Sequence, residues 1–151
     1  MLTNPNRRQF IDQPTIQKVI HHCPSNQWKL IIGLARFGGL RIQSELVDLT
    51  WDSINWEKGI ITVQSSKTKH IEGRESREVP LFPEIKTLLL EALKDAPIGE
   101  KRIIPNVDSS TNLRQGLIRI IKRAGVPVGR NLFNDLRASR ITELCKDYTE
   151  K

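Results

Sequence analysis

The sequence predicts a mainly α-helical fold into which a small three-stranded antiparallel sheet is inserted, an α+β class. Apolar residues recur at helical spacing before residue 50, short β-branched runs separated by a turn follow Trp51, and helical spacing returns after Pro83. A change of apolar period from about 3.6 to 2 residues marks a change from helix to strand. The sheet is therefore expected in the middle of the chain, with helices on both sides of it in sequence.

Three helices are expected before the sheet. The first, over residues 12–23, opens with Asp12 as a candidate N-cap and Pro14 in the first turn. The second, over residues 27–39, is apolar on nearly all sides until a glycine pair stops it. This pattern is typical of a helix in the middle of a fold. A third, short helix is expected over residues 41–49.

The sheet is expected from two strands in residues 52–64, with a turn at residues 57–59, and a third strand in residues 76–81. The linker between the last two strands, "SSKTKHIEGRES", is polar, and such loop tips often carry function. Three helices follow the sheet. They are expected over residues 84–95, 111–125 and 131–148.

The length of 151 residues favours a single domain, residues 1–151, in which residues 1–11 form a flexible N-terminal segment. No apolar run reaches the length of a membrane span, and the N-terminus does not resemble a secretory signal. A cytoplasmic protein is expected. Cys23 and Cys145 lie far apart without zinc-ligand spacing, so both are expected to be reduced thiols, and no metal site is predicted.

The formal net charge of +7 favours a polyanionic partner. Between Asp108 and Asp135 the sequence has no acidic residue. The basic residues of this interval are Arg114, Arg119, Lys122, Arg123 and Arg130. On a helix over residues 111–125, the first four lie opposite the apolar side chains. This basic face predicts contacts to the phosphates of double-stranded DNA; a solvated helix surface is the alternative.

Arg137 stands out in the last helix because residues three and four apart share a helix face. That spacing places Arg137 on the stripe of Phe133, Ile141 and Leu144, with Asn134 beside it. The stripe predicts a buried arginine. Such an arginine is held either by a carboxylate or helix-end carbonyls, or by an anionic ligand.

Two further groups of polar residues are candidates for a site. Arg41 follows the glycine pair at a helix start, and Glu45, one turn on, is placed to orient it. Lys67 and Lys69 lie in the polar linker of the sheet. Taken singly, these residues also fit a surface ion pair and a soluble loop tip.

Taken in order, "GGLRIQSELVDLTWDSINWEKGIITV", "SKTK", "REVPL" and "NDLRASR" resemble the catalytic domain of the tyrosine recombinase (phage integrase) family. The resemblance runs from about Arg8 to the end of the chain. It implies helices around a small antiparallel sheet, with a site that faces DNA. It also implies that a tyrosine attacks the scissile phosphate, forming a 3′-phosphotyrosyl link and releasing a 5′-hydroxyl, without metal, ATP or other cofactor.

The resemblance implies roles for residues of this sequence. Arg41 and Arg137 match the two family arginines, which can hold the non-bridging phosphate oxygens as negative charge builds on them. Lys67 is the expected proton donor to the leaving 5′ oxygen, with Lys69 in reserve on the DNA-binding loop. Asn134 occupies the position of a family histidine. Its amide can hydrogen-bond a phosphate oxygen but cannot transfer a proton.

The sequence departs from the family pattern at three places. The spacing from Arg41 to Glu45 is one residue longer than usual. The one tyrosine, Tyr148, follows Arg137 by about three helical turns, too few to match the nucleophile. No N-terminal core-binding domain fits before residue 12. We therefore expect a catalytic domain incomplete at its C-terminus that cannot cut DNA by itself, either a fragment of a longer enzyme or a product of a decayed mobile-element gene.

The resemblance also implies an assembly of four protomers on two DNA duplexes, joined through elements near the C-terminus. These elements are not found in this sequence, so a monomer is expected. Its expected location is the DNA of the bacterial nucleoid. Two other interpretations stay open. In one, the basic helix and the last helix form a non-catalytic, helix-turn-helix-like DNA reader. In the other, the chain is a remnant that folds but binds nothing specific.

Overall fold

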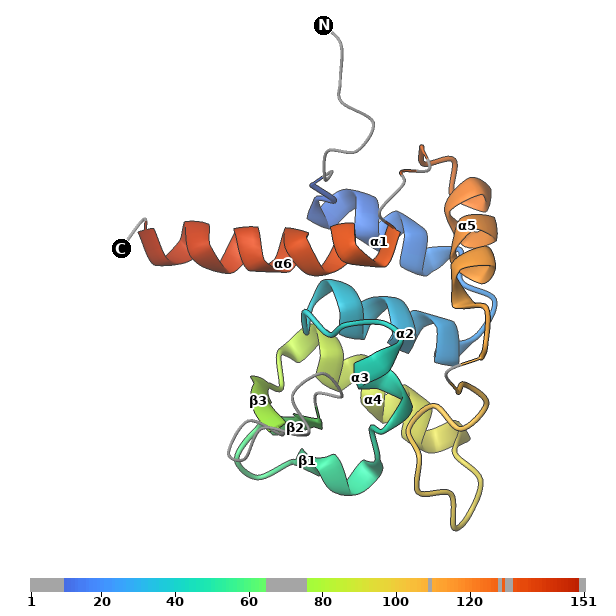
Figure 1. Ribbon diagram of the computed structural model, residues 1–151, viewed down its shortest axis with the longest axis vertical. Helices are drawn as coiled ribbons and strands as arrows, with labels where there is room; N and C mark the ends of the chain where they lie inside the picture. The colour runs from blue at the N-terminus through green and yellow to red at the C-terminus, as the bar shows by residue number, and fades with distance from the viewer. Residues whose placement is uncertain (1–9, 65–75, 109, 128, 130–131, 150–151) are drawn as a thin grey trace, which may run out of the picture.

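The structure, a computed structural model, describes residues 10–64, 76–108, 110–127, 129 and 132–149, the last four by their backbone (Figure 1). The α-helices are α1 (Gln13–His21), α2 (Asn26–Arg36), α3 (Ser44–Val47), α4 (Pro83–Asp95), α5 (Leu113–Arg123) and α6 (Leu132–Thr149). A 3₁₀ helix, η1 (Trp51–Ser53), precedes the strands β1 (Ile54–Asn55), β2 (Ile60–Gln64) and β3 (Ser76–Pro80). The predicted fold class, helices with an inserted three-stranded sheet, is confirmed.

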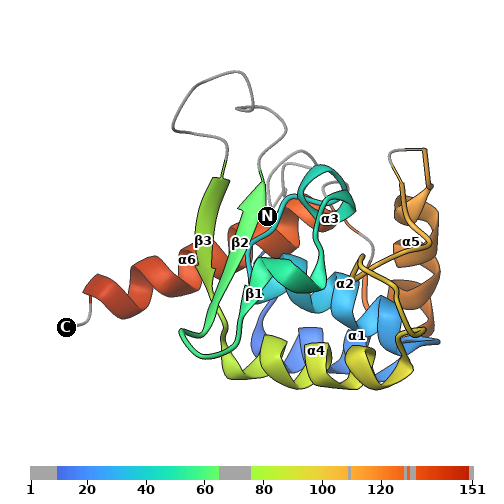
Figure 2. The same ribbon diagram turned by 90° about the horizontal axis from the view of Figure 1, so that it is seen from below.

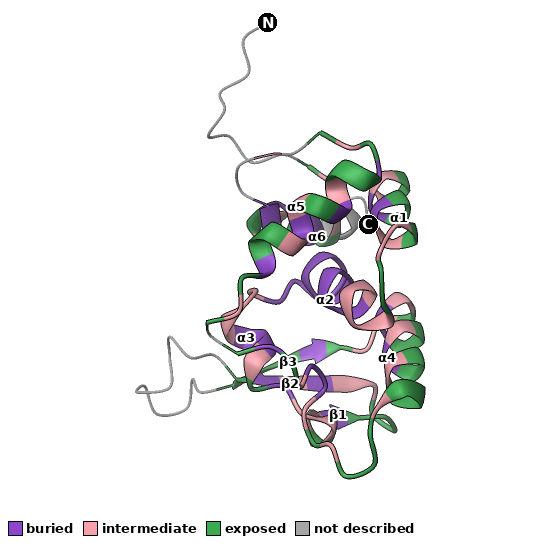
Figure 3. Ribbon diagram, turned by 90° about the vertical axis from the view of Figure 1, so that its right-hand side faces the viewer, coloured by how far each residue is buried: buried purple, intermediate pink, exposed green. Residues whose placement is uncertain are grey.

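Helix α2 forms the centre of the molecule. Ser25 caps its first turn by accepting a hydrogen bond from the Trp28 amide, and the seven residues from Leu30 to Arg36 are all buried. In Figure 1, α2 lies between α1 and α6 on one side and α3, α4 and the sheet on the other. In Figure 3 the buried colour follows α2, whereas α4 and α5 have exposed outer faces. The predicted central helix is confirmed.

The sheet has the order β1-β2-β3, with both pairs antiparallel. The turn between β1 and β2 includes Gly59, whose positive φ of 67° suits glycine. Ile61 and Val63 of β2 point into the core. The register pairs Val63 with Arg77 and Ile61 with Val79, so Arg77 lies on the same, inward face as the buried Val79.

Helix α5 has the two-sided arrangement that its sequence predicts. Its buried residues are Leu113, Leu117 and Ile120, followed by the buried C-cap residue Ala124. Its basic side chains, Arg114, Arg119, Lys122 and Arg123, are all exposed. The Asn112 side chain caps the helix by accepting a hydrogen bond from the Gln115 amide. The apolar face holds α5 on the core, and the basic face is open to a ligand.

The predicted buried stripe of α6 is wrong. Ile141 and Leu144 are 45% and 40% exposed, and Phe133 and Arg137 are half-buried. The buried residues are Leu132, Asp135, Leu136, Ser139 and Arg140. Apolar residues are spread around this helix, so their spacing does not select one face, and packing against α2 selects it instead.

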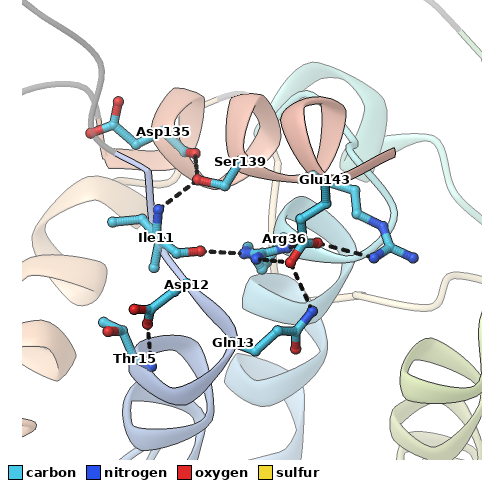
Figure 4. A network of polar contacts seen from close by, with 9 residues as sticks. Ile11, Asp12, Gln13, Thr15, Arg36, Asp135, Ser139 and Glu143 are labelled. Carbon is cyan, nitrogen blue, oxygen red and sulfur yellow. Dashed lines mark hydrogen bonds and ion pairs between the residues drawn. The ribbon is translucent and has the colours of Figure 1, made fainter. Parts of the chain in front are cut away.

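A polar network ties the start of the chain to α6 (Figure 4). Arg36 is fully buried, and its two terminal nitrogens donate to the Glu143 carboxylate at 2.7 Å each. Its Nε donates to the carbonyl of Ile11 at 2.9 Å, and the Ile11 amide donates to Ser139 Oγ at 2.7 Å. Gln13 Nε2 completes the set at 3.0 Å from Glu143. The network fixes α6 along α2.

Two further predictions concern the described residues. Cys23 and Cys145 are free thiols, as expected. Among the described residues, no helix combines the length and apolar character that a membrane span needs.

Candidate phosphate-binding site

The site is built on the turn that follows α2. Gly39 has a positive φ of 67°, a conformation that costs other L-residues about 1–2 kcal/mol. The Leu40 amide donates back to the Leu34 carbonyl at 3.2 Å, which closes the turn over the end of α2. The chain then enters α3 with Arg41 just before it. The glycine pair that stops α2 therefore also sets the position of Arg41.

Glu45 of α3 is the buried anion of the site, only 2% exposed. Its Oε1 accepts a hydrogen bond from the main-chain amide of Arg41 at 2.7 Å. The guanidinium of Arg77 binds both carboxylate oxygens, with Nη2 at 2.9 Å from Oε1 and Nε at 3.2 Å from Oε2. The expected contact between Glu45 and Arg41 exists, but through the main chain of Arg41 rather than its guanidinium.

These bonds decide the charge of Glu45. Burial raises the pKa of the Glu45 carboxyl, but the hydrogen bonds from Arg77 and from the Arg41 amide, with the positive charges of both residues, outweigh it. The net pKa lies below its usual value. Glu45 is therefore a carboxylate at neutral pH, and its charge is matched by Arg77.

The carbonyl of Gly39 binds both Arg137 and Arg77. It accepts a hydrogen bond from Arg137 Nε at 3.0 Å and another from Arg77 Nη2 at 3.3 Å. Three arginines, from the start of α3, from β3 and from α6, thus gather around one turn that holds one carboxylate. No hydrogen bond joins the Arg41 guanidinium to any other described residue, which makes this turn suited to an anion.

A pocket of about 280 Å³ adjoins the turn. It is lined by Ile42, Gln43, Leu113, Arg114, Leu132, Phe133 and Asn134. Gln43 Nε2 also donates a hydrogen bond to the carbonyl of Asp108, in the segment that precedes α5. The structure therefore brings the predicted residues Asn134 and Arg114 together, directly beside the segment that carries Arg41.

The other predicted site residues are placed as follows. Arg119, Lys122 and Arg123 continue along the exposed side of α5 from Arg114. Lys67, Lys69 and Arg130 lie outside the described residues. In Figure 2, the ends of β2 and β3 that flank residues 65–75 lie at the same edge of the molecule as α3. The two strands therefore end at the edge that carries Arg41.

Arg77 was not among the residues predicted for the site. A signal for it was present in "SREVPL", because residues two apart in a strand share a face. Arg77 therefore has to share the face of Val79, and an arginine on the inward face of a strand needs a buried partner. The sequence does not show that Glu45 is that partner.

The comparisons with known proteins agree with this geometry. The model of the phage integrase family matches residues 9–149. The chain belongs to that family. No curated protein shows significant similarity to the sequence. The solved XerA recombinase has a TM-score of 0.77 at 18% identity, over 95% of this chain and 53% of that one.

Two other solved structures show the same fold. Lambda integrase (residues 75–356) bound to DNA has a TM-score of 0.71 at 19% identity, over 96% of this chain and 54% of that one. The catalytic domain of bacteriophage HP1 integrase has a TM-score of 0.65 at 16% identity, over 93% of this chain and 74% of that one. The chain thus spans about half the length of the XerA and lambda proteins. The predicted resemblance to tyrosine recombinases is confirmed.

Proposed function

We propose that this chain is a DNA-binding catalytic core of a site-specific tyrosine recombinase, and that the turn at Gly39 is its phosphate site. The observation that carries the proposal is the convergence of Arg137 on the carbonyl of Gly39, two residues before Arg41. Family membership and the fold shared with a DNA-bound integrase support it.

In this proposal Arg41 and Arg137 bind the non-bridging oxygens of one phosphodiester. Two guanidinium groups stabilise the transition state more than the ground state, because negative charge increases on these oxygens during attack. In the full-length parent enzyme, a tyrosine oxygen forms a bond to phosphorus while the bond to O5′ breaks. Lys67 donates a proton to the leaving O5′, and Asn134 hydrogen-bonds a phosphate oxygen.

The basic residues outside the turn bind neighbouring phosphates of the duplex. These are Lys69, Arg114, Arg119, Lys122, Arg123 and Arg130. Such contacts contribute affinity and position but no sequence readout. In this proposal the chain binds DNA as a monomer. It does so on the bacterial nucleoid, and its gene belongs to a mobile element. By itself the chain does not cut DNA, because Tyr148 is not placed to serve as the nucleophile.

The proposal is tested by DNA binding with three variants of equal charge. Arg41→Ala and Arg137→Ala each remove a cation from the turn, and Lys86→Ala removes an exposed cation from α4, which lies at the opposite edge in Figure 2. We expect the first two to weaken binding about tenfold, and Lys86→Ala to change it less than about twofold. The measurement is fluorescence anisotropy with a labelled duplex of mixed sequence at low salt.

Equal affinities for all three variants would contradict the proposal. If variants of the α5 basic face alone lost affinity, the non-catalytic DNA-binding module would be the better interpretation. If the unmodified chain did not retard DNA even at low salt, the remnant that binds nothing specific would be favoured.

A further inference from the structure

Arg77 links three parts of the site that are distant in sequence. It starts from the inward face of β3, binds the carboxylate of Glu45 in α3, and donates to the carbonyl of Gly39, which also receives Arg137 of α6. Its side chain is 41% exposed, whereas that of Glu45 is 3% exposed. Arg77 therefore covers the buried carboxylate from the solvent side.

Arg77 and Arg41 differ in the hydrogen bonds that their guanidinium groups make. The fork of Arg77, formed by Nε and Nη2, is occupied by the two oxygens of Glu45. Among the described residues, the Arg41 guanidinium makes no hydrogen bond, although Glu45 holds its main-chain amide at 2.7 Å. A guanidinium already bound in bidentate fashion to a carboxylate lacks that fork for a phosphate, whereas an unbonded one has it.

Removal of Arg77 would leave Glu45 as a buried carboxylate without its cation. Such a group is costly in a protein interior, so it takes up a proton or moves toward water. Either change disturbs the acceptor that holds the Arg41 amide. The Gly39 carbonyl keeps the shorter of its two hydrogen bonds without Arg77, the one from Arg137 Nε at 3.0 Å.

We infer that Arg77 is a positioning residue, which sets Arg41 for its phosphate by holding both oxygens of Glu45 in a fixed position. This inference rests on the proposed function of the turn. Arg77 acts through Glu45 and not by contact with DNA.

Two variants with opposite expectations test the inference. Arg77→Lys keeps the positive charge but cannot bind both oxygens of Glu45 in a planar fork. Arg77→Met combined with Glu45→Gln loses the cation but leaves no buried charge, and the amide oxygen of the new side chain can still accept from the Arg41 amide. A positioning role predicts that the lysine variant binds DNA about fivefold more weakly, while the double variant stays within about twofold of the unmodified chain.

The measurement is the dissociation constant for a labelled duplex, taken well below the melting temperature of every variant. The reverse order, with Arg77→Lys near the unmodified affinity and the double variant weak, would show that Arg77 contacts phosphate and would overturn the inference. Unchanged binding by both variants would also overturn it. Arg41→Ala, measured in parallel, tests the site itself, so that failure of the proposed function is distinguished from failure of the role of Arg77.

Discussion

Arg36 and Arg137 both lie on helices, but their surroundings give them different tasks. Arg36 is fully buried, with its Nε and both terminal nitrogens bonded to Ile11 and Glu143. A buried cation with a full set of acceptors serves the fold, because it cannot leave them without a large cost. Arg137 is half-buried, and its Nε donates to the Gly39 carbonyl at the turn before Arg41. It is therefore the arginine of this pair that a ligand can reach.

Glu143 makes the stability of the protein depend on pH. The hydrogen bond from Arg36, with those from Arg140 and Gln13, lowers the pKa of the Glu143 carboxyl from 4.5 to about 2, against the effect of burial. A lowered folded-state pKa contributes stability above the unfolded pKa, and this is lost as the pH falls from about 4.5 to 2. We expect Glu143→Gln to lower the free energy of unfolding at pH 7 by about 2 kcal/mol, after allowance for solvent screening.

Urea denaturation at a series of pH values measures this effect. The difference between the unmodified chain and Glu143→Gln should be largest at neutral pH and should shrink as the pH falls toward 2. Glu57→Gln, a substitution at an exposed residue of the β1–β2 turn, is the matched control and should follow the unmodified chain. A difference for Glu143→Gln that stays constant with pH would show that its ionisation contributes nothing.

Single residues of the site were only partly predictable. Motif order predicted Arg41 and Arg137 as site residues, and both lie at the Gly39 turn. Helical spacing predicted an exposed face for Arg114, and Arg114 is exposed. The spacing around Arg137 did not give its burial, because the face that α6 buries depends on α2. The partner of Glu45 was also hidden, since Arg77 lies 32 residues away. Such pairings are set by tertiary packing, which local periodicity does not contain.

At the scale of elements, the sequence predicted α1 to α6 and the three strands of the described residues. The helix predicted over residues 41–49 is shorter in the structure, Ser44–Val47, and the 3₁₀ helix η1 was not predicted. The signals were strongest where local chemistry decides the structure, as at the cap Asp12 and the turn glycine Gly59. They were weakest for α6, whose apolar residues point in several directions. On α6, a polar network with Arg36, Ser139 and Glu143 takes the place of an apolar face. Such a network leaves no periodic pattern in the sequence from which it could be predicted.

Helix α5 carries a prediction of its own. Arg119 and Lys122 are three residues apart, so they share one exposed face. If both bind phosphates, replacement of both by alanine should reduce the slope of log K against log salt by about 2, at about 0.9 for each contact. The matched control replaces Lys86 and Lys94 of α4, and should leave the slope unchanged. A slope that stays the same for the α5 variant would identify its basic face as a solvated surface.

At the scale of the whole molecule, the fold gathers the site at one edge. In Figure 2, α3 and the open ends of β2 and β3 lie at the edge opposite α4. Bonds to Gly39 and Glu45 connect α3, β3 and α6, which are far apart in the chain. The core around α2 therefore supports three distant segments, whose arginines meet at the Gly39 turn.

The same architecture predicts that this chain forms no covalent link with DNA. Arg137 and Tyr148 lie on one continuous helix, and eleven residues at 1.5 Å each separate their Cα atoms by about 16 Å. Attack requires reacting atoms about 3 Å apart. Arg137 extends sideways from α6 to the Gly39 carbonyl, so a phosphate held there lies beside residue 137 and about three helical turns from residue 148. A nicked duplex that traps phosphotyrosyl adducts, followed by denaturing electrophoresis, should give no shifted band with the unmodified chain or with Tyr148→Phe. A band that appears with the unmodified chain and disappears in Tyr148→Phe would refute this prediction and make Tyr148 the nucleophile.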